Sequence, residues 1–159
     1  MTLDELLRAL RDDGHPDQHL HLDVRHAAEE TPDPDRFATA ILNRWVGADL
    51  PNTWVVASDS AYVIAAFEAH GRVLGIEVTT LLNVSARVVS RSNDAGADGV
   101  SVPFEATGRA ELASAARAGL VTAVITGDDR AALQRGSRWS ADALITDFPG
   151  DLTPFGPAD

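Results

Sequence analysis

The chain has 159 residues, 45% of them hydrophobic, and its 24 acidic and 13 basic residues give a net charge of −11. Such an acidic chain repels a phosphate backbone at long range, which argues against nucleic acid as a partner. The sequence has no cysteine, no apolar run long enough to span a membrane and no signal peptide at its start. These absences exclude disulfides and thiolate metal sites and predict a cytoplasmic protein.

Helical and extended patterns alternate along the first half of the chain. Thr2 and Glu5 form a potential capping box for a first helix, and residues 19–25 then read as a short strand. Asp33 followed by Pro34 predicts the start of a second helix, which we expect to stop at Gly47. A strand over 54–58 and a helix over 61–69, closed by Gly71, complete this half.

The second half repeats one strand-plus-helix unit. Strands are expected near Glu77, Gly99, Val121 and Ala143, which lie 22 residues apart. Helix stops are expected at three glycines between them: Gly96, Gly119 and Gly136. Strands such as 121–125 are almost continuously apolar, as a parallel sheet covered by helices requires.

These patterns predict an α/β fold with about six parallel strands and surrounding helices, a partial or shortened TIM-type barrel. We expect a single domain over residues 1–159, in which 150–159 form a loop-like tail. A complete eight-stranded barrel needs about 250 residues, so six units must curve into a smaller barrel, remain open or be completed by another chain. Because a bare sheet edge invites uncontrolled pairing, we expect a homodimer or another oligomer.

The strand over 19–25 alternates strictly between polar and apolar residues. His19, His21, Asp23 and Arg25 share one face because strand side chains alternate between the two faces. In a barrel this face lines the lumen. Imidazole groups transfer protons near neutral pH, and a guanidinium group binds phosphate or carboxylate. The pattern predicts His21, Asp23 and His19 as catalytic residues and Arg25 as a substrate contact; a hydrogen-bonded structural layer is the alternative.

Two further strand ends carry polar residues. Ser58 and Asp59 end one strand and begin a helix, where they could contact substrate or cap the helix. Asp147 follows the apolar run 143–146 and could contact substrate or cap the last turn. We predict Ser58 and Asp147 as substrate-binding residues.

Several segments resemble the glycerophosphodiester phosphodiesterases. The run Asp142-Ala143-Leu144-Ile145-Thr146-Asp147-Phe148-Pro149 is similar to the family's last strand, "D-G-I-I-T-D-Y-P", and Thr2-Leu3-Asp4-Glu5 to its "T-L-D-E" helix start. Leu22-Asp23-Val24-Arg25 lies where the family has "L-E-I-K". Val124-Ile125-Thr126-Gly127-Asp128 replaces "W-T-V-N-D" and lacks the tryptophan that lines the family's substrate pocket.

The resemblance implies a TIM-barrel hydrolase of phosphodiesters, connected to lipid metabolism. The family's "H-R-G", "E-x-D" and "H-D" segments, with its catalytic histidines and two metal carboxylates, have no counterpart here. By resemblance, Asp23 occupies a metal-ligand position and Arg25 a phosphate-contact position, so a divalent metal, Mg²⁺ or Ca²⁺, is a possible cofactor. A single carboxylate is a poor site for such ions, which need several oxygen ligands.

We therefore interpret the chain as a phosphodiesterase-like enzyme acting on a small phosphorylated or acidic molecule through its lumen histidine, aspartate and arginine residues. Two alternatives stay open: a non-catalytic binding or structural protein that retains the fold, and a subunit that needs a partner chain to complete the barrel.

Overall fold

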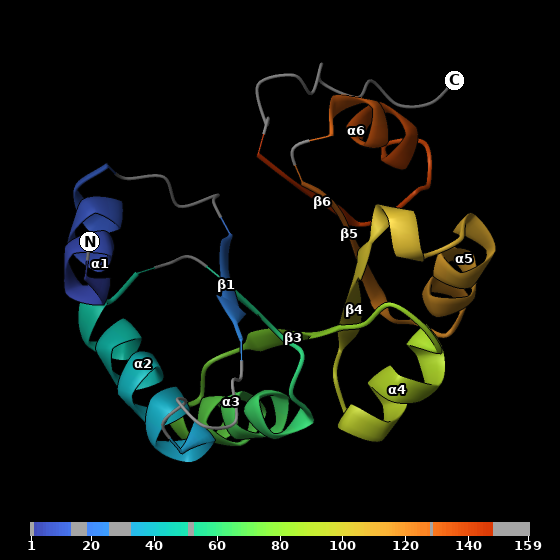
Figure 1. Cartoon of the computed structure of the whole chain (residues 1–159). Coiled ribbons are helices and arrows are strands. Elements are labelled where there is room, and N and C mark those ends of the chain that lie inside the picture. The colour runs from blue at the N-terminus through green and yellow to red at the C-terminus, as the bar shows by residue number, and fades with distance from the viewer. Residues whose placement is uncertain (1, 14–18, 26–32, 51–52, 128, 148–159) are drawn as a thin grey trace.

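The computed structural model describes residues 2–13, 19–25, 33–50, 53–127 and 129–147. Helices and strands alternate along these residues (Figure 1). The strands are β1 (Leu20–Val24), β2 (Trp54–Ser58), β3 (Val78–Asn83), β4 (Gly99–Pro103), β5 (Val121–Gly127) and β6 (Ala143–Thr146). The helices are α1 (Leu3–Asp13), α2 (Pro34–Ala48), α3 (Ala61–Leu74), α4 (Val88–Ala95), α5 (Arg109–Arg117) and α6 (Arg130–Gly136), with a 3₁₀ turn at Phe104–Ala106.

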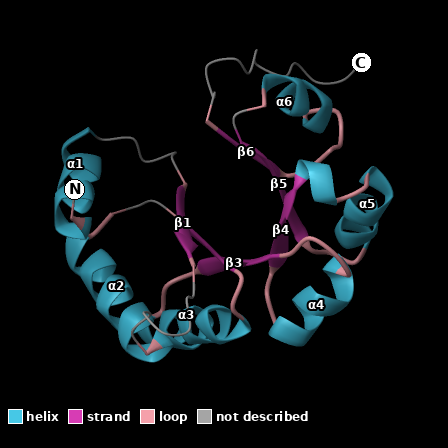
Figure 2. Ribbon diagram, in the orientation of Figure 1, coloured by secondary structure: helices cyan, strands magenta, loops and turns pink. Residues whose placement is uncertain are grey.

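The six strands form one parallel sheet in the order β1-β2-β3-β4-β5-β6. The sheet is curled, the helices lie on its outer side, and an opening separates β1 from β6 (Figure 2). The predicted fold, a partial TIM-type barrel of six parallel strands, is confirmed. Among the described residues, β1 and β6 each pair on one side only, so the barrel is open at these two edges.

The main core lies between the sheet and the helices. One cluster joins β1 and β2 to the first three helices around Leu42, Val56 and Phe67, and a second joins β4 and β5 to α4 and α5 around Val100 and Leu112. A smaller apolar cluster of Ala57, Leu81 and Ala123 lies on the opposite, inner face of the sheet. Strands buried on both faces explain why their sequences are almost continuously apolar.

Several local predictions are confirmed. The capping box is present, because the Thr2 amide donates to Glu5 Oε2 (2.7 Å) and the Glu5 amide donates to Thr2 Oγ1 (3.2 Å). Asp33 caps α2 by accepting a hydrogen bond from the Asp35 amide. Gly96 ends α4 in the left-handed conformation, with φ of 72°. The four strands of the second half begin at residues 78, 99, 121 and 143, close to the expected 22-residue period.

The predicted end of the third helix is wrong. Helix α3 continues through Gly71 to Leu74 and is capped by Gly75, with φ of 70°. Gly71 is required for close packing instead: a Cβ atom there would lie 3.1 Å from Val78 Cγ2 and 3.2 Å from the Ile76 carbonyl oxygen. The glycine therefore marks the approach of the helix to β3. Helix α2 also ends one residue later than predicted, at Ala48.

A threonine–aspartate contact occurs twice at the amino ends of the strands. Asp98 Oδ2, just before β4, accepts hydrogen bonds from the Thr80 amide (2.8 Å) and Thr80 Oγ1 (3.2 Å) on β3. Asp142, just before β6, accepts the same pair of bonds from Thr122 on β5 (2.8 and 2.9 Å). Both threonines are fully buried. The contact fixes the start of one strand against its neighbour and gives the repeat a structural basis.

Substituting Asp98 by alanine should lower the free energy of unfolding by about 1–3 kcal/mol, because it leaves the buried Thr80 amide without its acceptor. The measurement is urea denaturation followed by circular dichroism. Asp94→Ala, which removes an exposed carboxylate from α4, is the control and should change the free energy of unfolding by less than about 0.5 kcal/mol. Equal effects of the two substitutions would contradict the structural role of the contact.

Candidate functional site at the carboxyl ends of the strands

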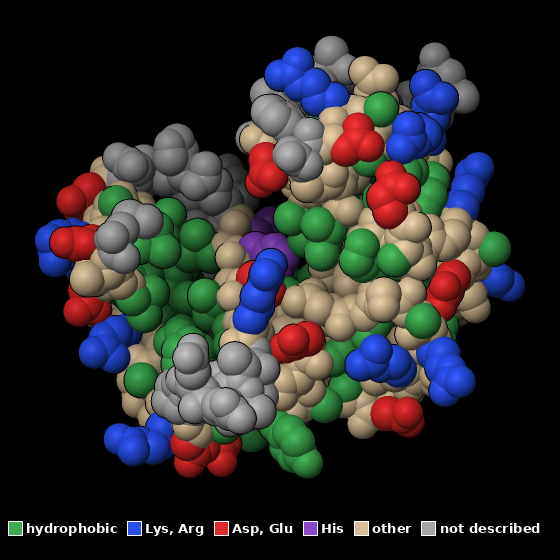
Figure 3. All heavy atoms as spheres, in the orientation of Figure 1, with side chains coloured by type: hydrophobic (Ala, Val, Ile, Leu, Met, Phe, Trp, Pro, Cys, Tyr) green, Lys and Arg blue, Asp and Glu red, His purple; other side chains and the backbone are tan. Residues whose placement is uncertain are grey.

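Strand β1 has the alternation that its sequence predicts. Leu20, Leu22 and Val24 pack against the cluster formed with the helices, so His21 and Asp23 project from the opposite, inner face. Figure 3 shows histidine side chains inside the open centre of the curled sheet, with Lys or Arg and Asp or Glu side chains in front of them. His21 and Asp23 are both exposed on this inner face, because β1 and β6, the two edge strands of the sheet, do not pair with each other.

Asp23 joins two strands that are not neighbours in the sheet. Its Oδ2 atom accepts a hydrogen bond from Arg25 Nε (3.2 Å), and its Oδ1 atom accepts one from Asn83 Nδ2 (3.0 Å), at the end of β3. Both carboxylate oxygens of Asp23 therefore accept a hydrogen bond from a described side chain. The Arg25 side chain is 86% exposed, so its guanidinium group keeps donors available to a ligand while its charge is partly balanced by Asp23.

A pocket of about 440 Å³ lies at this end of the sheet. Its polar lining comes from the carboxyl ends of the strands and the segments that follow them: Asp23, Arg25, Asp59, Asn83, Ser85, Arg91 and Ser101. The carboxyl ends of barrel strands are the usual position of active sites in this architecture, and the volume suits a small ligand. A larger hollow of about 640 Å³ between α2 and α3 is lined mainly by alanines and Tyr62 on the outer surface and brings together fewer polar groups.

Two polar atoms at the pocket have no hydrogen-bond partner among the described residues. Ser101 Oγ is one, in a residue that is only 1% exposed, and Asn83 Oδ1 is the other. Because Val100 and Val102 pack in the outer core, Ser101 points to the inner face, where it lines the pocket. Buried polar groups are normally satisfied by a partner, so both atoms indicate a site that is completed by a bound molecule or by water.

His21 is an exposed residue of β1, but partial desolvation of its imidazole on the inner face lowers its pKa from the ordinary value, and the nearby negative charge of Asp23 opposes this shift. A neutral imidazole at neutral pH follows, which suits a proton acceptor. The opposing effect of Asp23 also shows that the carboxylate and the imidazole are electrostatic neighbours on the inner face.

An NMR titration of the imidazole protons should give His21 a pKa below about 6.5, the value for an unperturbed histidine. Asp23→Asn should lower this pKa further, because the substitution removes the charge that raises it. Since the folded-state pKa lies below the unfolded one, His21 should contribute stability above about pH 6.5 that is lost as the pH falls through the folded pKa. A His21 pKa that rises in Asp23→Asn would contradict this arrangement.

His21 lies on the same face as Asp23 but is not among the residues that line the pocket. The remaining predicted residues lie elsewhere. His19 is at the amino end of β1, where its Nδ1 atom contacts Thr53 Oγ1, away from the pocket lining. Ser58 is fully buried; its hydroxyl donates to the Val24 carbonyl oxygen (2.6 Å) and accepts from the Ser60 amide (3.2 Å). Asp59, not Ser58, lines the pocket at the end of β2. Asp147 is exposed beyond β6 and does not line the pocket. The roles of His19, Ser58 and Asp147 in catalysis or binding stay predictions, which this placement does not support.

The described residues do not fit a divalent cation on their own. They contain no group of three or more histidine, aspartate or glutamate side chains that could hold a metal ion. Asp23, the predicted ligand, already accepts hydrogen bonds at both oxygens from Arg25 and Asn83. The requirement for Mg²⁺ or Ca²⁺ stays a prediction, and no chemical step below depends on it. Asp128 and the predicted tail over 150–159 lie outside the described residues.

No protein-family model matches the sequence, and no curated protein is detectably similar to it. Solved structures match it well. A protein of Silicibacter pomeroyi described as a glycerophosphoryl diester phosphodiesterase superposes with a TM-score of 0.77 over 94% of this chain and 53% of its own, at 17% identity. A phosphodiesterase of Oleispira antarctica, solved with its product sn-glycerol-3-phosphate, gives 0.70 over 93% and 57%, at 16% identity.

The chain has the fold of the glycerophosphodiester phosphodiesterases. It spans little more than half the length of these two structures. A protein of Burkholderia cenocepacia described as a phosphonomutase also superposes, with a TM-score of 0.60 over 93% of this chain and 70% of its own, at 15% identity. The phosphodiesterase-like fold is therefore compatible with more than one phosphorus chemistry, and the reaction has to be argued from the pocket.

None of the helices in the described parts of the chain is long and apolar enough to cross a membrane.

Proposed function

We propose that this chain is a phosphodiesterase-like protein that binds a small phosphorylated or acidic molecule in the strand-end pocket and hydrolyses a phosphodiester there. The observation that carries the proposal is the convergence of Asp23, Arg25 and Asn83 at the carboxyl ends of β1 and β3, where they line a pocket with two orphaned polar atoms. The fold shared with phosphodiesterase structures supports it.

Each of the inner-face side chains has a role in this proposal. Arg25 contacts the anionic phosphate group, since a guanidinium group matches two phosphate oxygens at once. His21 lies two residues before Asp23 on the same face and outside the pocket lining, so in this proposal its neutral imidazole takes the proton of the attacking water through a bridging water molecule. The imidazolium ion then returns this proton to the oxygen of the leaving group, and the phosphodiester yields a monoester and an alcohol. Asp23 stabilises the imidazolium ion that forms, consistent with the direction in which it moves the pKa of His21.

A second candidate function rests on the two free sheet edges. Strands β1 and β6 each pair on one side only in the described residues, and the inner face between them is accessible. A partner chain that pairs with these edges would complete the barrel and supply further groups to the pocket. In this alternative the chain alone binds the ligand but does not hydrolyse it. A second copy of the same chain, in a homodimer, is one such partner.

The test is hydrolysis of a panel of glycerophosphodiesters by the purified chain, with Mg²⁺, Ca²⁺ or a chelator, beside His21→Gln. We expect turnover that His21→Gln lowers by about 100-fold, a typical effect of removing a general base. No turnover by a folded, monomeric chain would refute hydrolysis by the chain alone. Recovery of turnover in an oligomeric fraction would favour the partner-completed site.

A further inference from the structure

Arg91 is a pocket residue that the sequence patterns do not assign. It lies on α4, the helix that follows β3, and it lines the strand-end pocket together with Arg25. Arg25 donates to Asp23, whereas the side chain of Arg91 makes no hydrogen bond or ion pair with any described residue. An arginine without such a partner in the lining of a pocket, in a chain with a net charge of −11, is a specific local feature.

The orphaned atoms of the pocket define what a ligand must offer. The Ser101 hydroxyl can donate to an oxyanion, and it is buried without another partner. Asn83 uses its Nδ2 atom to donate to Asp23, so its free Oδ1 atom is an acceptor that requires a donor from the ligand. The pocket therefore calls for a group that is anionic and also carries a hydroxyl hydrogen.

We propose that Arg91, Ser101 and Asn83 form an anion-binding wall of the pocket that selects a terminal, unesterified phosphate group over a phosphodiester. This inference rests on the proposed function, since it assigns the phosphate end of the same ligand. A terminal phosphate has a second pKa near 6, so around neutral pH it exists partly as a form that bears both negative charge and a P–OH donor. A diester carries one negative charge and has no P–OH hydrogen for Asn83.

Charge favours the same choice. The pocket lining holds two carboxylates, Asp23 and Asp59, and two arginines, Arg25 and Arg91; Asp23 pairs with Arg25, whereas Arg91 has no such partner among the described residues. The doubly charged form of a terminal phosphate interacts with Arg91 more strongly than a singly charged diester does, and the singly charged form offers the P–OH donor, so each form makes one interaction that the diester lacks. In the hydrolysis proposed above, the wall would retain the monoester product. Inorganic phosphate should therefore inhibit turnover by competing with the substrate.

The test compares binding of inorganic phosphate and dimethyl phosphate by NMR titration of the ¹⁵N-labelled chain at pH 7 and constant ionic strength. We expect phosphate to bind at least about 10-fold more tightly than dimethyl phosphate, with amide shifts around Asn83 and Ser101. Arg91→Gln should weaken phosphate binding by about 10-fold, and Ser101→Ala by about 5-fold.

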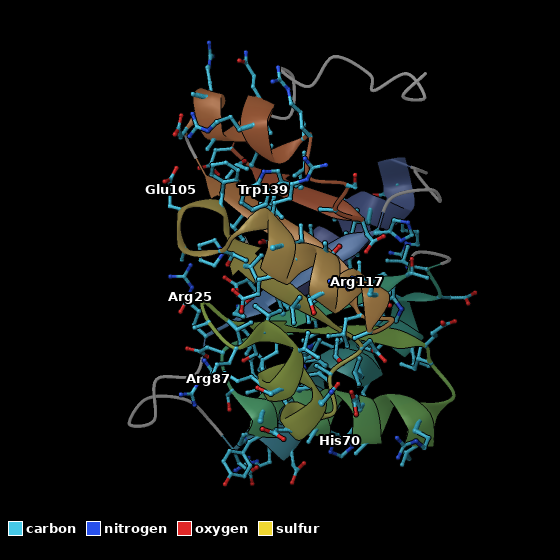
Figure 4. The ribbon with its side chains drawn as sticks, turned by 90° about the vertical axis from the view of Figure 1, so that its right-hand side faces the viewer. Arg25, His70, Arg87, Glu105, Arg117 and Trp139 are labelled. Atoms are coloured by element: carbon cyan, nitrogen blue, oxygen red, sulfur yellow. The ribbon has the colours of Figure 1, made fainter. Side chains whose placement is uncertain are left out.

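Arg87→Gln is the matched control. Arg87 immediately precedes α4 and lies on the same side of the molecule as Arg25 (Figure 4), but it does not line the pocket. The control removes the same charge a short distance away and should change the dissociation constant by less than about 2-fold. An equal loss in the two arginine variants would overturn the proposal, because it would show a diffuse charge effect.

Equal affinity for phosphate and dimethyl phosphate, or no phosphate-dependent shift, would also overturn it. Phosphate binding and turnover are measured separately, so the anion-binding wall and the proposed hydrolysis can fail independently. Phosphate binding that depends on Arg91 in a chain without turnover supports the anion-binding wall and refutes hydrolysis. Turnover in a chain whose phosphate binding is insensitive to Arg91→Gln refutes the wall alone.

Discussion

Replacing Gly99 by alanine should lower the free energy of unfolding by about 3 kcal/mol or more. Gly99 opens β4, which pairs with β3 on one side and β5 on the other. A Cβ atom at this position would lie 2.2 Å from the Val121 carbonyl oxygen and 2.7 Å from Leu81 Cδ2. The first of these neighbours is backbone and cannot rotate away, so the substitution must push β4 and β5 apart in the middle of the sheet.

Gly47→Ala provides the opposite expectation within the same chain. Gly47 lies in α2, and a Cβ atom there would meet nothing within 4 Å. Alanine in a helix should therefore raise the free energy of unfolding by about 0.5–1 kcal/mol. Urea denaturation of both variants measures the difference. A Gly99→Ala protein within about 1 kcal/mol of the unsubstituted chain would show that β4 and β5 do not approach as closely as described.

The sequence was sufficient to predict the fold because its signals are local and regular. Apolar strands, helix caps and a repeating strand–helix unit required a parallel sheet covered by helices. The misplaced end of α3 had a tertiary cause: Gly71 lies in the helix because β3 packs closely against it. A glycine selected for close packing and one selected for a helix cap are indistinguishable without the neighbouring strand.

The site was predictable only where one strand carries it. The alternation of β1 placed His21 and Asp23 on the inner face directly from the sequence. The sequence of β2 gives no such indication, because its residues are apolar without alternation. In the structure, Trp54 and Val56 pack against the helices, so Ser58, which shares their face of the strand, is also buried on the helix side. Asp59 consequently reaches the pocket.

Asn83, Arg91 and Ser101 come from three separate elements. Asn83 and Ser101 are register partners on the paired strands β3 and β4, and Arg91 lies on α4 between these strands in the chain, so the strand register, which the sequence does not show directly, brings them to one pocket. Asn83 ends β3 after two leucines, a strand-end signal similar to that of Asp147, and could have been noticed on that ground. Arg91 and Ser101 had no distinguishing pattern, since an arginine on a short helix and a serine in a strand are both common.

Asp23→Asn should separate binding from turnover in the strand-end pocket. The amide is nearly isosteric with the carboxylate, and its oxygen can still accept the hydrogen bond from Asn83 that Asp23 accepts at 3.0 Å. It cannot balance the charge of Arg25 or stabilise an imidazolium ion at His21. We therefore expect glycerophosphodiester turnover to fall by about 100-fold, whereas phosphate binding is retained or becomes tighter because Arg25 loses its competing anion.

The two readouts distinguish this role from simple structural damage. A damaged pocket would lose phosphate binding and turnover together, and the free energy of unfolding would fall. The proposed role predicts lower kcat, an unchanged or lower dissociation constant for phosphate, and a lower pKa for His21, because Asp23 is the charge that raises it. Asp12→Asn, which makes the same change at an exposed position of α1, should leave all three quantities unchanged. Full turnover in Asp23→Asn would instead show that the Asp23 carboxylate has no part in catalysis.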